Sequence, residues 1–136
     1  MSSSEKIDLL ILKFKNCRTS DECREAFREI RQYLSENWVR LIGWGQFEAW
    51  GIYYVSPDKK RCVYVAINPR PDPPVRIVEE VEFKDPADLA NKIWLDQKGC
   101  IPFRRIAEEI KRVFGVDVEM DSRNKYIRAL FGEASD

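Results

Sequence analysis

Residues 46–68 read QFEAWGIYYVSPDKKRCVYVAIN, and this stretch decides the fold. Its two halves are rich in β-branched and aromatic residues, and a turn around Pro57 and Asp58 separates them. The pattern therefore predicts a β-hairpin with strands over residues 46–56 and 61–68. Because side chains alternate between the faces of a strand, both faces of the first strand receive aromatic rings. One face carries Gln46, Glu48, Trp50, Ile52 and Tyr54, and the other carries Phe47, Ala49, Gly51, Tyr53 and Val55.

The second strand of this hairpin has two unlike faces. One is purely aliphatic, as is typical of a face that packs in a core, and the other looks less like a core filler. We expect the second face to be the more accessible one. The aliphatic set is Val63, Val65 and Ile67, and the opposite set is Cys62, Tyr64 and Ala66.

Two amphipathic helices are predicted before the hairpin. They cover residues 4–15 and 20–38, because apolar residues recur on one face of each at helical spacing. Thr19 followed by Glu22 forms a capping-box pattern at the start of the second helix. The short link between the helices predicts an αα-hairpin that packs on the sheet.

The residues after the hairpin predict one more strand and then helices. A stiff Pro-rich connector at 69–74 leads into renewed alternation, and Asp85-Pro86 is a strong helix start. The predicted elements are a strand over 75–84, helices over 86–96, 102–114 and from 121 or 122 to 131, and a short strand at 116–120. The whole predicts an α+β fold, in which an N-terminal helical hairpin packs on a small antiparallel sheet of three to four strands, with C-terminal helices. No repeat or domain boundary interrupts it, so we expect a single domain over residues 1–136.

The composition excludes several classes of function. The 136 residues carry 23 basic and 23 acidic side chains, and a net charge of zero argues against binding driven mainly by phosphate neutralisation. The absence of histidine removes Ser-His-Asp and Cys-His catalysis and the HExxH zinc site. No stretch resembles a signal peptide or a membrane span, so we expect a cytoplasmic protein. The charged fraction of 34% is common in hyperthermophile proteins.

Four cysteines permit three disulfide pairings. The spacing of Cys17 and Cys23 suits a bridge between two helix ends, and paired cysteines in a cytosolic protein point to a hyperthermophilic source. A zinc site built from all four thiolates is an alternative, but no pair has CxxC-type spacing. Buried free thiols are the third interpretation of Cys17, Cys23, Cys62 and Cys100.

The stretch between Trp44 and Arg76 also suggests a function. Aromatic and cationic side chains fall together there, and single-stranded nucleic acid needs both, since its bases lie on rings and its phosphates find Lys and Arg. The ordinary alternative is a sheet with core aromatics on one face and solvated charges on the other. The candidates for stacking are Trp44, Trp50, Tyr54 and Tyr64, and those for phosphate are Lys60, Arg61, Arg70 and Arg76.

Two other motifs compete with this interpretation. Pro57-Asp58 followed by Glu82-Phe83-Lys84 loosely matches metal-dependent PD-(D/E)xK nucleases, although Asp58 falls in a hairpin turn. The helices predicted over 102–114 and 122–131 could form a helix-turn-helix, with a longer link than usual. In that arrangement, the residues facing a major groove are Arg123, Asn124, Lys125 and Arg128.

The helical hairpin, the aromatic-rich strands, the Pro-rich connector and the helix from Pro102 to Gly115 together resemble the ThermoDBP family of crenarchaeal single-stranded DNA-binding proteins and their relatives. The resemblance covers nearly the whole chain in layout, and residues 44–76 in aromatic and basic content. It implies an α+β domain that sequesters bases against apolar walls of a cleft. No sustained heptad tail precedes Asp136, so the coiled-coil dimer of that family is not expected to follow, and a homodimer stays open.

These observations favour a non-enzymatic, sequence-tolerant binder of single-stranded DNA or RNA. The resemblance puts DNA slightly ahead. We expect no catalytic residue, no cofactor, no metal and no membrane association. A metal-dependent nuclease and an adaptor that meets a protein partner with exposed aromatics are the alternatives.

Overall fold

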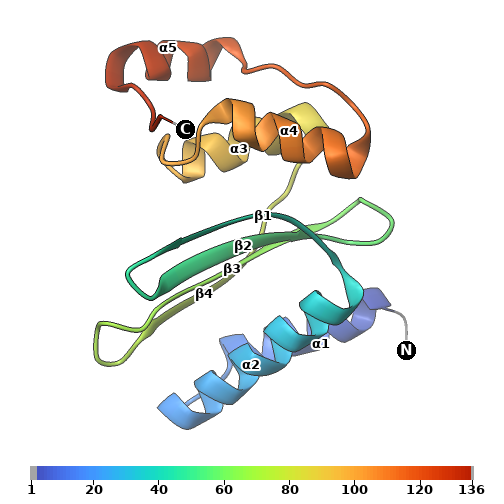
Figure 1. Ribbon diagram of the computed structural model, residues 1–136. Coiled ribbons are helices and arrows are strands. Elements are labelled where there is room, and N and C mark those ends of the chain that lie inside the picture. The colour runs from blue at the N-terminus through green and yellow to red at the C-terminus, as the bar shows by residue number, and fades with distance from the viewer. Residues whose placement is uncertain (1–2, 136) are drawn as a thin grey trace. The chain divides into compact units, whose positions relative to one another are not determined.

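The computed structural model describes residues 3–135 and has the predicted α+β fold (Figure 1). Its described part contains five helices and one antiparallel sheet of four strands. The chain divides into two compact units, of which the first ends at Glu80 and the second begins at Val81. None of the described helices is long and apolar enough to span a membrane.

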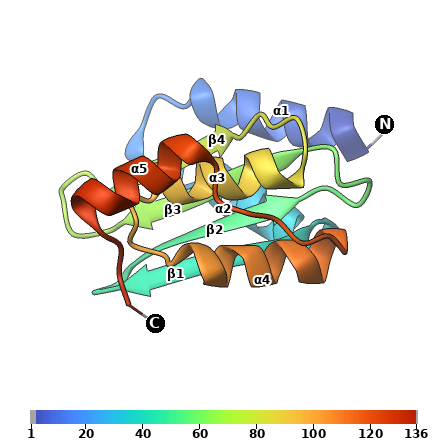
Figure 2. The same cartoon turned by 90° about the horizontal axis from the view of Figure 1, so that it is seen from above.

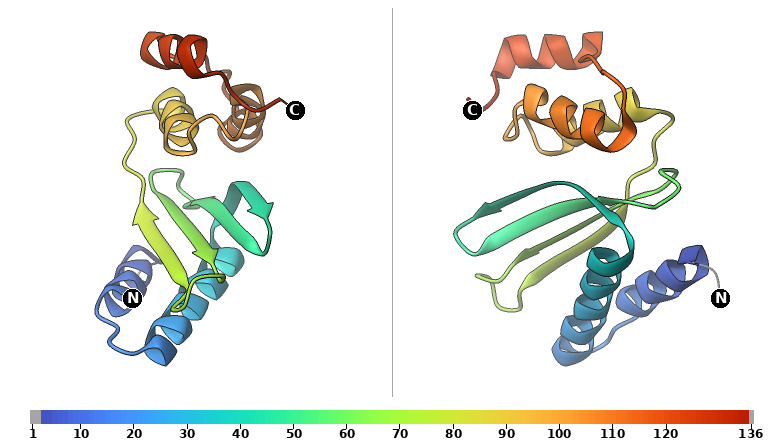
Figure 3. Two further views of the ribbon diagram at one scale, coloured as in Figure 1. Left: turned by 90° about the vertical axis from the view of Figure 1, so that its left-hand side faces the viewer. Right: turned by 45° about the vertical axis from the view of Figure 1, so that its right-hand side comes forward.

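The first unit is the predicted helical hairpin followed by the sheet. Both helices lie on the same face of the sheet (Figure 3). The strands follow one another in the order β1-β2-β3-β4, each antiparallel to the next (Figure 2). The elements are α1 (Ser3–Lys15), α2 (Ser20–Asn37), β1 (Val39–Gln46), β2 (Ala49–Val55), β3 (Cys62–Asn68) and β4 (Val75–Glu80).

Strand β1 was not predicted, and the single strand predicted over 46–56 is wrong at its start. Gly43 and Gly45 suggest a break in the sequence, yet both pair with β2. The chain turns at Phe47 and Glu48, where the predicted strand was continuous. Strand β4 also ends four residues before the predicted boundary of 84. Backbone pairing to a long neighbouring strand outweighs the low strand propensity of glycine here.

The helix-side face of the sheet forms the core of the first unit. The predicted alternation is confirmed there, because one face of β2 and the aliphatic face of β3 pack against apolar residues of α1 and α2. A fully buried Leu, Ile or Phe contributes about 1.5–3 kcal/mol to stability, so this layer supplies much of the driving force for folding. The sheet residues are Trp50, Ile52, Tyr54, Val63, Val65 and Ile67, and the helix residues include Ile7, Leu10, Phe27, Ile30 and Leu34.

The second face of β3 is buried too, so the expectation that it is accessible is wrong. Cys62, Tyr64 and Ala66 expose at most 8% of their surface. The Tyr64 ring stacks on Tyr53 of β2 at a centroid distance of 4.3 Å, so the two rings cover one another across the strands. Burial also raises the pKa of Cys62 to about 12, which leaves the thiol protonated and inert.

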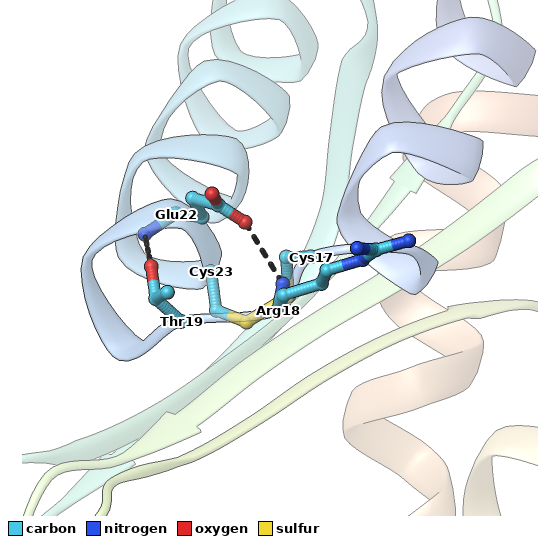
Figure 4. Close-up of a disulfide and its surroundings, with 5 residues drawn as sticks. All are labelled: Cys17, Arg18, Thr19, Glu22 and Cys23. Atoms are coloured by element: carbon cyan, nitrogen blue, oxygen red, sulfur yellow. Dashed lines mark hydrogen bonds between the residues drawn. A yellow bond between two sulfur atoms is a disulfide. The ribbon is translucent and has the colours of Figure 1, made fainter.

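A disulfide joins the end of α1 to the start of α2 (Figure 4). It links Cys17 and Cys23, the pair whose spacing suits a bridge, while Cys62 and Cys100 are free thiols, so the four thiolates of the zinc alternative are not available together. Thr19 caps α2 as predicted, since its Oγ1 accepts a hydrogen bond from the Glu22 amide at 3.1 Å. The Glu22 carboxylate in turn accepts one from the Arg18 amide at 2.9 Å, which fixes the connection between the helices.

The second unit contains the three predicted C-terminal helices, while the short strand at 116–120 does not form. Asn91 and Asn124 tie the first and last of these helices together: the Asn124 amide nitrogen donates to the Asn91 backbone and side-chain oxygens, both at 3.0 Å. Asn91 also accepts from the Asp121 amide at 2.9 Å. This network orders the segment before the last helix without a strand. The helices are α3 (Pro86–Asp96), α4 (Phe103–Phe114) and α5 (Ser122–Phe131).

Candidate nucleic-acid interface

The two ends of the sheet divide the predicted binding residues. The β1–β2 turn at 47–48 and the β3–β4 loop at 69–74 lie at one end, and the β2–β3 turn at 56–61 lies at the other (Figures 1 and 3). Lys60 and Arg61 belong to the β2–β3 turn. Trp50, Arg70 and Arg76 belong to the end with the other two connections, which we call the tip. The structure therefore does not bring the predicted cations together on one surface.

Two of the four rings predicted to stack on bases are buried and packed against other side chains. Tyr54 is 7% exposed and packs in the core beneath the helices. Tyr64 is 8% exposed, and its hydroxyl accepts a hydrogen bond from Trp44 Nε1 at 2.9 Å. A Cβ on Gly51 would collide with both groups of this hydrogen bond, which accounts for a glycine in the middle of β2. These contacts leave Trp44 half-buried and engaged.

Arg61 lies between two carboxylates. Its guanidinium contacts Glu80 at 2.6 Å and Asp8 at 2.7 Å, so it links α1 to the ends of β3 and β4. The hydrogen bond that Arg61 donates to Glu80, and after it the one that it donates to Asp8, raise the pKa of Arg61. A phosphate would have to displace these acids. Lys60 is exposed beside it in the turn.

Asp58, the acid of the nuclease-like motif, closes the β2–β3 turn. Its Oδ1 accepts hydrogen bonds from the Ser56 hydroxyl at 2.6 Å and from the Lys60 amide at 3.0 Å, and these bonds lower the pKa of Asp58. Glu82, the other acid of the motif, belongs to the second unit. Within residues 3–135, no group of three or more acids, cysteines and histidines is placed to hold a metal ion.

Phe47 stands at the tip in an unusual backbone conformation. Its φ is 51° and that of Glu48 is 72°, so both central residues of the two-residue β1–β2 turn have positive φ. Such turns normally take Asn-Gly, and a bulky residue with positive φ is strained by roughly 1–3 kcal/mol. The ring of Phe47 is nevertheless 68% exposed. The strained turn therefore carries a large apolar side chain that stays in solvent. No burial of the Phe47 ring compensates for the free energy of the backbone strain.

Arg70 lies beside this ring. Its guanidinium carbon is 5.3 Å from the centroid of Phe47, within the range of a cation–π contact. Arg70 follows Pro69 in the Pro-rich loop, and its amide donates to Asn68 Oδ1 at 3.2 Å. Prolines stiffen the loop, so the charge of Arg70 is held near Phe47.

Trp50 makes a second cation–π contact in this region, with a partner that the sequence did not suggest. The guanidinium carbon of Arg31, in α2, lies 4.3 Å from the Trp50 ring centroid. Phe27 packs against the same ring at a centroid distance of 6.0 Å, and Trp50 stays half-buried. The candidate site at the tip therefore consists of Arg31, Phe47, Trp50 and Arg70.

A hollow of about 300 Å³ opens beside Arg31. Arg28 in its wall bonds the carboxylate of Glu25 and, at 3.2 Å, Gln32. The sequence does carry a signal for this surface, because Arg24, Arg28 and Arg31 recur at i, i+4 and i+7 on one face of α2. The hollow is lined by Arg28, Arg31, Gln32, Ser35 and Tyr54.

The last of the predicted phosphate-binding residues is Arg76. Arg76 is half-buried in β4, and among the described residues its Nε finds no hydrogen-bond partner.

The helix-turn-helix motif lies in the second unit. Its Asn124 is 2% exposed and hydrogen-bonded to Asn91, so the Asn124 amide cannot contact a base edge. Arg123 and Lys125 remain exposed.

Comparison of the chain with models of known protein families, with curated proteins and with solved structures finds no match. Function is therefore inferred from the geometry of the chain alone.

Proposed function

We propose that the first unit binds single-stranded nucleic acid at the tip, with unpaired bases stacked on exposed rings and phosphates on neighbouring arginines. The observation that carries the proposal is the exposed ring of Phe47 on a strained turn beside Arg70. Strained residues cluster at functional sites. At a turn with no function, a residue such as Asn or Gly would adopt the same backbone conformation with less strain. The site is smaller than the eight residues that the sequence suggested.

The chemistry of the tip suits stacking better than phosphate attraction. The chain has no net charge, and Glu48 and Asp72 lie near the cations of the tip in sequence. Stacking of a base on an aromatic ring contributes ~1–3 kcal/mol and tolerates any base. Arg31 and Arg70 already lie against rings, and a guanidinium in that position can pair with a phosphate while a base occupies the free part of the ring. We therefore expect affinity with little sequence preference.

Affinity for a labelled dT oligonucleotide of about ten nucleotides tests the proposal by fluorescence anisotropy. Phe47→Ala removes one stacking surface, so we expect the dissociation constant to rise about tenfold. Arg70→Ala removes one phosphate contact, and the slope of log affinity against log salt should fall by about 0.7. Phe131→Ala is the matched control, because Phe131 is an even more exposed phenylalanine in the second unit.

Equal losses for Phe47→Ala and Phe131→Ala would contradict the proposal, as would unchanged affinity in both. The same titration with rU separates DNA from RNA preference. The nuclease alternative predicts Mg²⁺-dependent cleavage of the oligonucleotide that Glu82→Ala abolishes. Lys60→Ala, at the opposite end of the sheet, should bind as the wild type does.

A further inference from the structure

The last helix of the second unit presents a large apolar surface to solvent. Tyr126, Leu130 and Phe131 expose 67%, 59% and 82% of their area. Tyr126 and Leu130 are four positions apart and therefore lie close together on the helix, and Phe131 follows Leu130 as the last residue of α5. An exposed patch of this kind on a small domain marks an interaction site. We call it the α5 patch.

An apolar groove of about 220 Å³ adjoins the α5 patch. Phe131 belongs to both, so a side chain lying on the patch can continue into the groove. The floor includes Trp94, which is 1% exposed and fixed by the hydrogen bond of its Nε1 to Glu133 at 2.7 Å. A rigid ring makes the groove a preformed one. Its lining is Trp94, Leu95, Lys98, Ile127, Phe131 and Gly132.

The charged side chains that α5 and the groove lining contribute are all cations. Helix α5 carries Arg123, Lys125 and Arg128 and no acid, and Lys98 lies on the wall of the groove. The acids that flank the helix are engaged: Asp121 caps it by accepting from the Asn124 amide at 2.7 Å. Glu133 accepts from Trp94, from the Phe103 amide at 3.2 Å and from Arg128 at 3.5 Å. Asp96, next to the groove residue Leu95, is a further acid at the edge, so the surface is apolar with a border that is mostly cationic.

We infer that the α5 patch and its groove bind a short acidic segment of a partner protein, with a large apolar side chain of that segment entering the groove. Acids on the partner would face Arg123, Lys125 and Lys98, while its apolar residues cover Phe131 and Leu130. A second copy of this chain fits worse, because a two-fold contact would set the same cations against one another. Nucleic acid fits the cations but leaves the apolar groove unfilled.

Binding of a fluorescein-labelled synthetic peptide in which aspartate and glutamate alternate with leucine and phenylalanine tests this inference on the full-length chain. We expect Phe131→Ala to weaken binding at least about tenfold, as truncation of a central aromatic anchor does. Lys125→Glu should weaken it as well. Phe47→Ala is the matched control and should leave peptide binding unchanged, since Phe47 belongs to the first unit. The Trp94 indole N–H signal in NMR spectra should shift on peptide addition and report the groove directly.

Several outcomes would overturn the inference. Equal binding of a peptide with lysine at every acidic position would show that charge plays no part. Self-association that Phe131→Ala abolishes in sedimentation would assign the patch to a second copy, and binding of phosphatidylserine vesicles in place of the peptide would assign it to a lipid surface. Because Phe131 is highly exposed, its truncation should not unfold the chain, and an unchanged circular dichroism spectrum checks this.

Discussion

At the tip, Phe47 and Glu48 hold a backbone conformation that Asn and Gly adopt with less strain. We expect the double variant Phe47→Asn with Glu48→Gly to raise the free energy of unfolding by about 1 kcal/mol, because it relieves that strain. The same variant removes the exposed ring, so it should bind dT oligonucleotides about tenfold more weakly. Urea unfolding and anisotropy measure the two effects.

A variant that loses stability, or that gains stability and keeps its affinity, contradicts the assignment of the strained turn to binding. Glu48→Gly alone serves as control. It relaxes one of the two strained residues and keeps the ring, so it should be more stable than the wild type with unchanged affinity.

Among the elements, the α1–α2 hairpin depends on its disulfide. The disulfide closes a short loop. In the chain-entropy model it lowers the conformational entropy of the unfolded chain, which stabilises the folded state by about 2 kcal/mol. We expect Cys23→Ser, or reduction of the wild type, to lower the free energy of unfolding by about that amount. Urea unfolding with and without reductant measures it. Cys100→Ser, which changes a free exposed cysteine, should have no comparable effect.

The helices could be predicted from the sequence because their signals are local. Asp85 and Thr19 cap helices where the sequence indicates, and Gly115 ends α4 with a φ of 77°. Strand β1 could not be predicted in this way, since Gly43 and Gly45 have low strand propensity and their backbone pairing with β2 is not reported by the propensity of any single residue.

The candidate site shows the same division. Aromatic and basic content singled out residues 44–76 as the candidate region. Alternation alone cannot say whether the second face of a strand is covered, so Tyr64 looked accessible. Arg31 comes from another element and meets Trp50 only through packing of α2 on the sheet. Arg61 looked free because its partners, Asp8 and Glu80, lie far from it in the sequence.

For the whole molecule, we propose one binding surface in each unit. The tip of the first unit would hold single-stranded nucleic acid, and the α5 patch of the second would hold an acidic partner segment. Since each surface is built within its own unit, Phe47→Ala and Phe131→Ala should each impair one activity and leave the other intact. A chain of zero net charge can carry both, because each depends on local rings and local cations.

The most direct test of the central claim is an NMR titration of the isotope-labelled chain with a dT oligonucleotide. We predict that the amide signals of residues 47–50 and 68–76 and the indole signal of Trp50 shift, while the β2–β3 turn at 56–61 stays unchanged. Shifts confined to the β2–β3 turn, or no shifts at the tip at saturating oligonucleotide, would contradict the account.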